Sequence, residues 1–281
     1  MNKSLLALYG LKWNPFSPEL PTEALLATAP IEDFVWRIEN THVREGGFAL
    51  ITGVPGTGKS VALRILAARL ERLPDLTVAA VAHPSANLAD FYRELGDLFA
   101  VDLKPHNRWR GFKALRTRWL AHLDASLMRP ILLIDEAQEL APPLMKELRL
   151  LASSHFDSRT LLSVILAGDT RLTELLRRDD LLPLGSRIRA RMNLEHAARK
   201  DLLACLEHLC RGAGNPSLLA PPLAEALADH AMGNYRVLTN MAAEILAHAA
   251  RHELTQLDEK LFFDVFHPEQ RPKPRRSRSA A

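Results

Sequence analysis

The chain has 281 residues, of which 47% are hydrophobic and 25% charged, values typical of a globular protein with one large domain or a core and a satellite. The sequence contains no run of 18 apolar residues, which argues against a membrane span, and no signal peptide, so we expect a cytoplasmic protein. Cys205 and Cys210, the only cysteines, lie in a leucine-rich stretch and are expected to be buried thiols rather than zinc ligands.

The positive charge is concentrated at the C-terminus. The formal net charge of +3 becomes −2 when the five basic residues of the last eleven are left out: Arg271, Lys273, Arg275, Arg276 and Arg278. This tail is broken by prolines and has almost no apolar side chains. It is therefore predicted to be disordered and available to a polyanion.

From about Phe48, short β-rich runs alternate with longer amphipathic stretches, which predicts an α/β fold with a parallel sheet covered by helices. The expected elements in chain order are strand 48–52, helix 58–70, strand 76–82, helices 87–99 and 110–123, strand 131–135, helix 142–153, and strands 161–168 and 191–194. After about Ala197 the β pattern stops, and helices are expected over 198–212, 220–231 and 235–252. The predicted divisions are 1–46, an N-terminal segment near the nucleotide; 47–195, the α/β core; 196–266, a helical lid; and 267–281, the basic tail.

A phosphate-binding loop follows the first strand. Gly53-Val54-Pro55-Gly56-Thr57-Gly58-Lys59-Ser60 matches the pattern GxxxxGK[ST] in full, between a predicted strand and a predicted helix. The glycines let backbone N–H groups point at phosphate oxygens, and the helix directs its positive dipole end toward them. Lys59 is expected to bridge the β- and γ-phosphates, the Ser60 hydroxyl to bind Mg²⁺, and Val61 to complete the ATP-binding segment.

The carboxylates that such a loop requires come at the end of the strand 131–135. In ILLIDEAQ, Asp135 is expected to hold Mg²⁺, directly or through water, and Glu136 to orient and polarise the attacking water. A pair of acids ending a buried strand is costly without a cation, which argues against a purely structural role. The pair also favours ATP hydrolysis over nucleotide binding alone.

Three further positions are candidates for contact with the γ-phosphate. Asp169 follows the next predicted strand and is either a polar sensor or an ordinary turn residue. Arg187, with Arg189 and Arg191 as alternatives, is a candidate finger that reaches a neighbouring chain's γ-phosphate, or part of a solvated basic edge. Arg236 begins a helix of the predicted lid and is either a sensor of the nucleotide or a surface residue.

A basic helical face is predicted between the second and third strands. It contains no acid, is flanked by Trp109 and Trp119, and includes Lys104, Arg108, Arg110, Lys113, Arg116 and Arg118. Arg110, Lys113 and Arg116 are spaced by three, so they are expected to share one helical face opposite the apolar stripe. Such a face is typical of contact with nucleic-acid phosphates, although a solvated face remains the alternative. No base-reading motif accompanies it, so DNA binding is expected to be largely independent of sequence.

Together these motifs resemble an AAA+ ATPase with a five-stranded parallel sheet and a small all-helical lid. Within that superfamily the chain most resembles the ExeA-like group, which includes the TniB- and TnsC-type transposition regulators. The resemblance covers about residues 5–252 and is carried by Tyr9-Gly10-Leu11, Asn14-Pro15-Phe16, GFALITGVPGTGKS, LLIDEAQEL, AGDTRL, SRIRAR and GNYRVLTNMAAEILAHA.

The resemblance implies roles for several residues. Asn14, Pro15 and Phe16 would help enclose the adenine, Arg187 would be the finger acting on a neighbouring chain, and Arg236 the sensor arginine of the lid. Relatives often have Gln where this chain has Asp169, a departure that affects the sensor role.

The resemblance also implies what the protein does. Transposition regulators assemble with ATP as homo-oligomeric rings or filaments on duplex DNA and recruit a transposase, and this is the leading hypothesis. ExeA-type secretion ATPases continue into a membrane helix and a wall-binding domain, which this sequence lacks. The alternatives are an ExeA-type secretion ATPase or another assembly ATPase that acts on proteins alone, and a replication initiator-like DNA loader.

Overall fold

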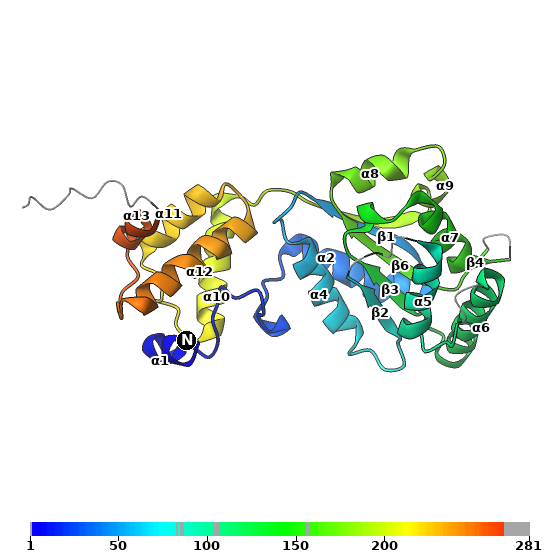
Figure 1. Ribbon diagram of the computed structural model, residues 1–281, viewed down its shortest axis with the longest axis horizontal. Coiled ribbons are helices and arrows are strands. Elements are labelled where there is room, and N and C mark those ends of the chain that lie inside the picture. The colour runs from blue at the N-terminus through cyan, green and yellow to red at the C-terminus, as the bar shows by residue number, and fades with distance from the viewer. Residues whose placement is uncertain (1, 83, 85–86, 104–106, 156–157, 267–281) are drawn as a thin grey trace, which may run out of the picture. The chain divides into compact units, whose positions relative to one another are not determined.

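The computed structural model describes residues 2–82, 84, 87–103, 107–155 and 158–266, which form two compact units (Figure 1). Residues 27–196 make up an α/β unit, and of the described residues 2–26 and 197–266 belong to a helical unit. Lys104 and the basic tail, two of the predicted polyanion contacts, lie outside the described residues.

A five-stranded sheet forms the centre of the α/β unit. Its strands are β1 (Gly47–Gly53), β2 (Val78–Val81), β3 (Ile131–Ile134), β6 (Ser163–Gly168) and β7 (Ile188–Leu194). Their order is β2-β3-β6-β1-β7, and every neighbouring pair is parallel. The predicted α/β fold with five parallel strands is confirmed. Because the strands are parallel, the loops that follow β1, β3 and β6 meet at one edge of the sheet.

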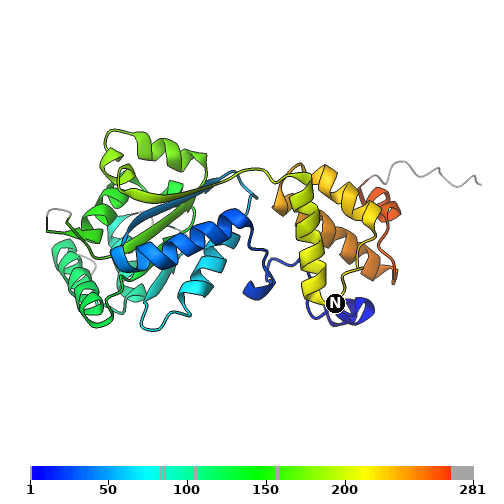
Figure 2. The ribbon, with the colours of Figure 1, turned by 180° about the vertical axis from the view of Figure 1, so that it is seen from behind.

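Helices cover this sheet, as Figure 1 shows and Figure 2 shows from behind. The main helices are α2 (Ala29–Arg37), α4 (Lys59–Leu70), α5 (Leu88–Leu98), α6 (Arg108–Ser126), α7 (Pro142–Ala152), α8 (Thr170–Arg177) and α9 (Leu182–Gly185). All four residues of β3 are buried, as expected for a strand covered on both faces. Trp119 of α6 packs edge-to-face on Phe99 after α5, with ring centroids 5.2 Å apart, which fixes the α5–α6 pair in the core.

Some elements of this unit were not predicted from the sequence. Helix α2 continues through a π-helical turn, Ile38–His42, into the short α3, Val43–Glu45. Its buried residues include Ile31, Phe34 and Ile38, whose spacing was a visible helical signal. Other elements are too short to give a periodic pattern. They are the antiparallel pair of two-residue strands β4 (Ser153–Ser154) and β5 (Arg159–Thr160), and the single 3-10 turn η3 (Ala137–Glu139).

The helical unit contains α1 (Asn2–Tyr9), the turn η1 (Thr22–Ala24), α10 (Arg199–Ala213), α11 (Pro221–Ala231), α12 (Tyr235–Arg251) and α13 (Glu259–Phe266). The N-terminal residues belong to its core. The hydroxyl of Tyr9 donates to the Leu254 carbonyl at 2.7 Å, and Asn215 Nδ2 donates to the Tyr9 carbonyl at 2.9 Å. The segment 1–46, expected as one N-terminal piece, is therefore divided: residues 1–26 join the helical unit and 27–46 the α/β unit.

Cys205 and Cys210 lie on the buried side of α10. Burial raises the pKa of each thiol to about 12, so both are neutral core side chains at ordinary pH. Within the described part of the chain, no helix has the length and apolarity needed to cross a membrane.

Candidate nucleotide site

The phosphate loop lies between β1 and α4. Gly56 and Gly58 have φ of 85° and 103°, a region that favours glycine, and Gly58 is the N-cap of α4. A Cβ at Gly53 would approach the Leu194 carbonyl oxygen to 2.5 Å, so this position also needs glycine. The loop leaves the N-terminus of a 12-residue helix open toward a ligand, the arrangement that binds phosphate.

Lys59 lies inside this loop and is 7% exposed. Its Nζ donates to the carbonyls of Gly53 at 2.9 Å and Val54 at 3.2 Å. These two acceptors hold the ammonium group within the curve of the loop without neutralising it. Among the described residues this buried ammonium group has no direct ion pair, so its positive charge is suited to the β- and γ-phosphates of ATP.

The predicted metal ligands meet at the same edge of the sheet. Ser60 Oγ donates to Asp135 Oδ2 at 2.8 Å, joining the first turn of α4 to the residue after β3. Neighbouring oxygens in an octahedral Mg²⁺ shell are about 2.9 Å apart, given metal–oxygen distances of 2.0–2.1 Å. The two oxygens therefore fit adjacent ligand positions of one Mg²⁺, with water and phosphate oxygens as the remaining ligands. Bound Mg²⁺ would neutralise charge on the phosphates and orient them.

Glu136 follows Asp135 in a left-handed conformation, with φ of 48°. Its backbone N–H donates to Asp135 Oδ1 at 2.9 Å, and its carboxylate Oε2 accepts a hydrogen bond of 2.5 Å from Gln138 Nε2. The strained turn directs two consecutive carboxylates differently: Asp135 toward Ser60 and Glu136 toward Gln138. This separation is what a metal ligand and a water-activating base require.

Gln138 was missed as a site residue by the sequence analysis, although it belongs to the LLIDEAQEL segment. It is 8% exposed, and its Oε1 accepts from the Asp169 backbone N–H at 3.1 Å. A Cβ at Gly168 would collide with this oxygen. The available signal was a polar residue two positions after Glu136, directly beside the predicted catalytic pair.

Asp169 makes its side-chain contacts with Arg171, two residues further along the chain. Its side chain caps α8 by accepting from the Arg171 backbone N–H at 2.9 Å, and it pairs with the Arg171 guanidinium at 2.8 Å. Burial opposes ionisation of Asp169, but the hydrogen bonds from Arg171 outweigh it, and the positive charge of Lys59 adds to them, so its pKa is lowered. Asp169 is therefore an ionised cap beside the site, and its role as a sensor stays a prediction.

Of the three candidate finger arginines, Arg187 lies far from the phosphate loop of its own chain, whereas Arg191 is in register with Leu50, three residues before Gly53. Ile188 of β7 is in register with Phe48 and Leu194 with Gly53, so Arg187 lies at the end of the sheet opposite the loop. Six strand residues separate these two ends by about 20 Å. Any contact of Arg187 with a γ-phosphate therefore has to be made to a neighbouring chain.

Each of these arginines has a contact within the chain. Arg187 donates to the Pro183 carbonyl, Arg189 forms an ion pair with Glu45 at 3.0 Å, and Arg191 donates to the Gly185 carbonyl at 3.1 Å. Arg189 is thus matched with an acid, whereas the printed contact of Arg191 is with a neutral carbonyl.

The remaining predicted nucleotide contacts lie in the helical unit. Phe16 is 4% exposed in the core of that unit, and Asn14 Oδ1 accepts from the Phe16 backbone N–H at 3.0 Å. Arg236 lies in the first turn of α12, which Asn234 caps, and its side chain is exposed. The contact of Asn14, Pro15 and Phe16 with adenine and the sensor role of Arg236 stay predictions.

The predicted basic face on α6 is divided by the structure into two groups. Arg108 and Arg116 turn toward α7: Arg108 pairs with the buried carboxylate of Glu147, and Arg116 donates to the Leu150 and Ser153 carbonyls at 3.0 and 2.5 Å. Arg110, Lys113 and Arg118 are exposed. The expectation that Arg110, Lys113 and Arg116 share one solvent face is wrong for Arg116. Its pKa is lowered because it is partly buried.

The contact of Glu147 with Arg108 was not predicted from the sequence. It is 3% exposed and accepts hydrogen bonds from Arg108 and from the Tyr92 hydroxyl. Burial and the bond to Glu147 raise the pKa of Tyr92, and Glu147 raises that of Arg108. Arg108 is therefore engaged in a structural ion pair between α6 and α7.

Known proteins are similar to this chain in sequence or in fold. Residues 42–176 match the family model of the AAA domain. General secretion pathway protein A of Aeromonas hydrophila is 33% identical over 203 residues, which cover 71% of this chain and 36% of that protein. This chain therefore matches about a third of the length of that curated relative.

Among solved structures, the ORC2 protein of Aeropyrum pernix superposes with a TM-score of 0.68 at 16% identity, covering 89% of this chain and 70% of that one. Cdc6p of Pyrobaculum aerophilum gives 0.69 at 15% identity, covering 86% and 67%. Domain III of the replication initiation protein DnaA of Thermotoga maritima gives 0.62 at 16% identity, covering 92% and 100%. At these identities the likeness concerns the fold.

The α/β unit thus contains an AAA domain with the P-loop AAA+ fold, and its loop, Lys59, Ser60 and Asp135 are arranged to bind ATP and Mg²⁺. The chain is homologous to General secretion pathway protein A over the matched segment.

Proposed function

We propose that the protein is an ATP-dependent DNA-binding ATPase that assembles on duplex DNA and regulates transposition by recruiting a transposase. The observation that carries the proposal is the exposed basic face of α6, formed by Arg110, Lys113 and Arg118. Among the described residues none of the three has an acidic partner, in contrast to Arg108.

The geometry of this face suits a DNA backbone. Gly111, Leu115 and Trp119 face the core, whereas Arg110, Lys113 and Arg118 are exposed. Arg118 lies at the edge of the exposed face, because it is seven residues from Gly111, about two helical turns. Eight residues separate Arg110 from Arg118, a rise of about 12 Å, which lets the face meet two or three phosphates. Contacts of this kind fix position without reading sequence.

ATP binding and hydrolysis at the phosphate loop would control assembly. ATP held by the phosphate loop and Lys59 would bring a γ-phosphate to the surface of one chain, where Arg187 of the next would contact it. Hydrolysis by water oriented at Glu136 would remove that contact. Binding to DNA and release from it would then follow the state of the nucleotide.

Salt dependence of DNA affinity tests this proposal. The Arg110→Ala, Lys113→Ala and Arg118→Ala triple variant is expected to bind every duplex sequence more weakly and to flatten the slope of log affinity against log salt by about two to three units. A matched control replaces Arg44, Arg72 and Lys200, which are also exposed, and removes the same charge elsewhere. Equal affinity of the triple variant and the parent at every salt concentration would remove the basis of the proposal.

The secretion relative supports a second candidate, an ATPase that drives assembly of proteins without DNA. The two functions differ in one measurement: the second predicts no ATP-dependent affinity for duplex DNA. A DNA loader would bind duplex DNA but would not capture a transposase. Co-sedimentation of the protein with duplex DNA, ATP and an integrase-type transposase separates all three.

A further inference from the structure

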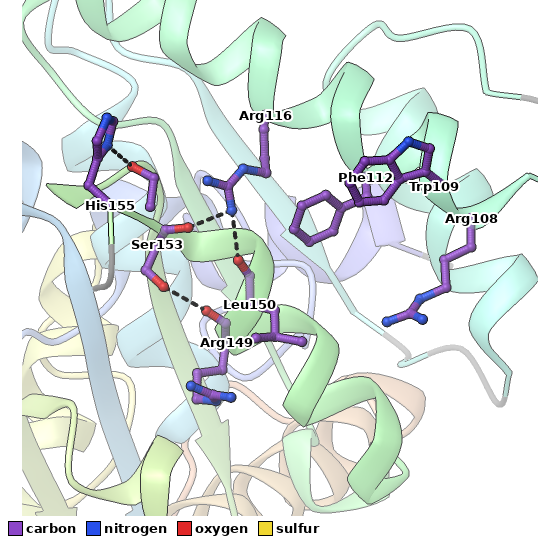
Figure 3. A pocket seen from close by; sticks show the side chains of 9 residues that line it. Arg108, Trp109, Phe112, Arg116, Arg149, Leu150, Ser153 and His155 are labelled. Carbon is purple, nitrogen blue, oxygen red and sulfur yellow. Dashed lines mark hydrogen bonds between the residues drawn. The ribbon is translucent and has the colours of Figure 1, made fainter. Parts of the chain in front are cut away.

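A second concave site lies on the α/β unit between α6 and the C-terminal end of α7 (Figure 3). It encloses about 500 Å³, a volume in the range of small-molecule sites. Its walls come from residues 108–116 and 149–155, whereas the phosphate loop comprises residues 53–60. The nucleotide site therefore does not account for it.

The aromatic wall of this pocket is unusually exposed. Trp109 is 74% exposed, and its ring is parallel to that of Phe112, with an interplanar angle of 6° and centroids 6.1 Å apart. The guanidinium of Arg116 lies 5.0 Å from the Phe112 centroid. The planar groups of Trp109, Phe112 and Arg116 thus already stack along this wall. Most of the Trp109 indole is exposed, so a planar group of a ligand can stack on it.

The charge of the pocket is positive. Arg108, Arg116, Arg149 and His155 line it, and no described lining residue is acidic. The nearby Glu147 is buried and matched by Arg108, whereas the bonds that Arg116 makes to carbonyls leave its charge uncompensated. No described residue pairs with the Arg149 side chain. An occupant should therefore be anionic as well as planar.

We propose that this α6–α7 pocket binds an unpaired nucleotide of single-stranded DNA, with the base stacked on Trp109 and the phosphate near Arg149. Exposed aromatic side chains beside cationic groups are the usual elements of single-strand recognition. The site deepens the proposed DNA-binding function, because Lys113 of the exposed basic face is one residue from Phe112 on the same helix. A DNA duplex with unpaired bases would contact both surfaces.

The test uses the full-length protein with ATP and Mg²⁺ and a fluorescein-labelled dT12 strand, followed by anisotropy. Trp109→Ala is expected to lower dT12 affinity by about 5- to 100-fold, whereas Trp109→Tyr, which keeps an aromatic ring, should retain most of it. Arg149→Ala should weaken binding and flatten the salt slope by about 0.7. The control is Trp36→Ala on α2, which removes a comparably exposed tryptophan and should leave dT12 affinity unchanged.

Failure of this proposal is distinguishable from failure of the duplex function. If the parent binds dT12 through Trp109 but does not bind duplex DNA, the pocket assignment stands and the transposition proposal falls. Equal dT12 affinity in Trp109→Ala and the parent overturns the pocket assignment, whatever the duplex result. It is also overturned if a labelled (Glu-Gly-Tyr)4 peptide binds through Trp109 while dT12 does not, because the pocket would then take an acidic protein segment.

Discussion

Nε2 of Gln138 lies 2.5 Å from Oε2 of Glu136, and the other end of the same amide accepts the backbone N–H of Asp169. One side chain thus spans the gap between the ends of β3 and β6. Since Gln138 is buried and anchored at Asp169, it fixes the direction of the Glu136 carboxylate. We infer that Gln138 positions the base that orients the attacking water.

Gln138→Ala should therefore lower kcat for ATP hydrolysis by about 10- to 100-fold and leave KM for ATP within about threefold, because the phosphate loop is untouched. Gln138→Asn, one methylene shorter, should not restore the link. The comparison is Glu139→Ala, which removes only the exposed pair with Arg171 and should retain near-parental kcat. Steady-state phosphate release measures all three, and an unchanged kcat in Gln138→Ala would exclude the positioning role.

Replacing Glu136 by Gln should separate ATP binding from hydrolysis. The amide retains the shape and can still accept from Gln138, but it cannot take a proton from water, so turnover should fall by about 10²- to 10⁴-fold. Lys59→Ala should instead lose nucleotide affinity, because it removes the buried ammonium group of the loop. Calorimetry with ATP and Mg²⁺, together with phosphate release, measures both effects. Normal turnover in Glu136→Gln would remove Glu136 from the catalytic step.

Much of the nucleotide site was predictable because its residues are local in sequence or end buried strands. The loop 53–60 and the pair Asp135 and Glu136 follow from motif and strand pattern alone. The meeting of Ser60 with Asp135 required only the parallel order of β1 and β3. In contrast, the bond of Gln138 to Asp169 depends on side-chain length and on a glycine at 168, which no periodicity reveals.

For the basic face of α6, the sequence predicted the helix but not the contacts of its arginines. Charge and helical spacing placed Arg110, Lys113 and Arg116 together, but a helix pattern cannot show which neighbouring element supplies a partner. Glu147 and the carbonyls of Leu150 and Ser153 come from 34 or more residues further along the chain, and they engage Arg108 and Arg116. Long-range partners of this kind decide whether a surface arginine is available to a ligand.

Arg116 provides a prediction about stability. Arg116→Ala would leave the carbonyls of Leu150 and Ser153 without their charged donor, at a cost of about 1.5–3 kcal/mol in the free energy of unfolding. Arg118→Ala removes the same side chain from an exposed position and should change stability by less than about 0.5 kcal/mol. Urea unfolding compares the two variants. Equal stability of both would show that the α6–α7 hydrogen bonds contribute nothing measurable.

The two cysteines allow a test of the helical unit. With a pKa of about 12, only about one thiol in 10⁴ is ionised at pH 8, so a thiol reagent should react with Cys205 and Cys210 only after unfolding. Between the ordinary thiol pKa of about 8.5 and pH 12 the folded state holds more protons, so stability should fall as pH rises. Ellman's reagent, with and without guanidinium, checks the first expectation. Rapid reaction in the folded protein would contradict the burial of these thiols.

The position of Arg187 at the opposite end of the sheet from the phosphate loop predicts shared active sites. A chain with Arg187→Ala can bind ATP but supplies no finger, and a chain with Lys59→Ala supplies the finger but binds ATP poorly. Each variant alone should therefore be nearly inactive, whereas a mixture should regain activity where a Lys59→Ala chain presents Arg187 to an Arg187→Ala site. Activity per chain of the parent should also rise with protein concentration.

The control is Arg189→Ala. Arg189 is matched by Glu45, so the Arg189→Ala protein should hydrolyse ATP at near the parental rate. No recovery on mixing, together with turnover independent of concentration, would mean that each chain completes its own site and that Arg187 is not the finger.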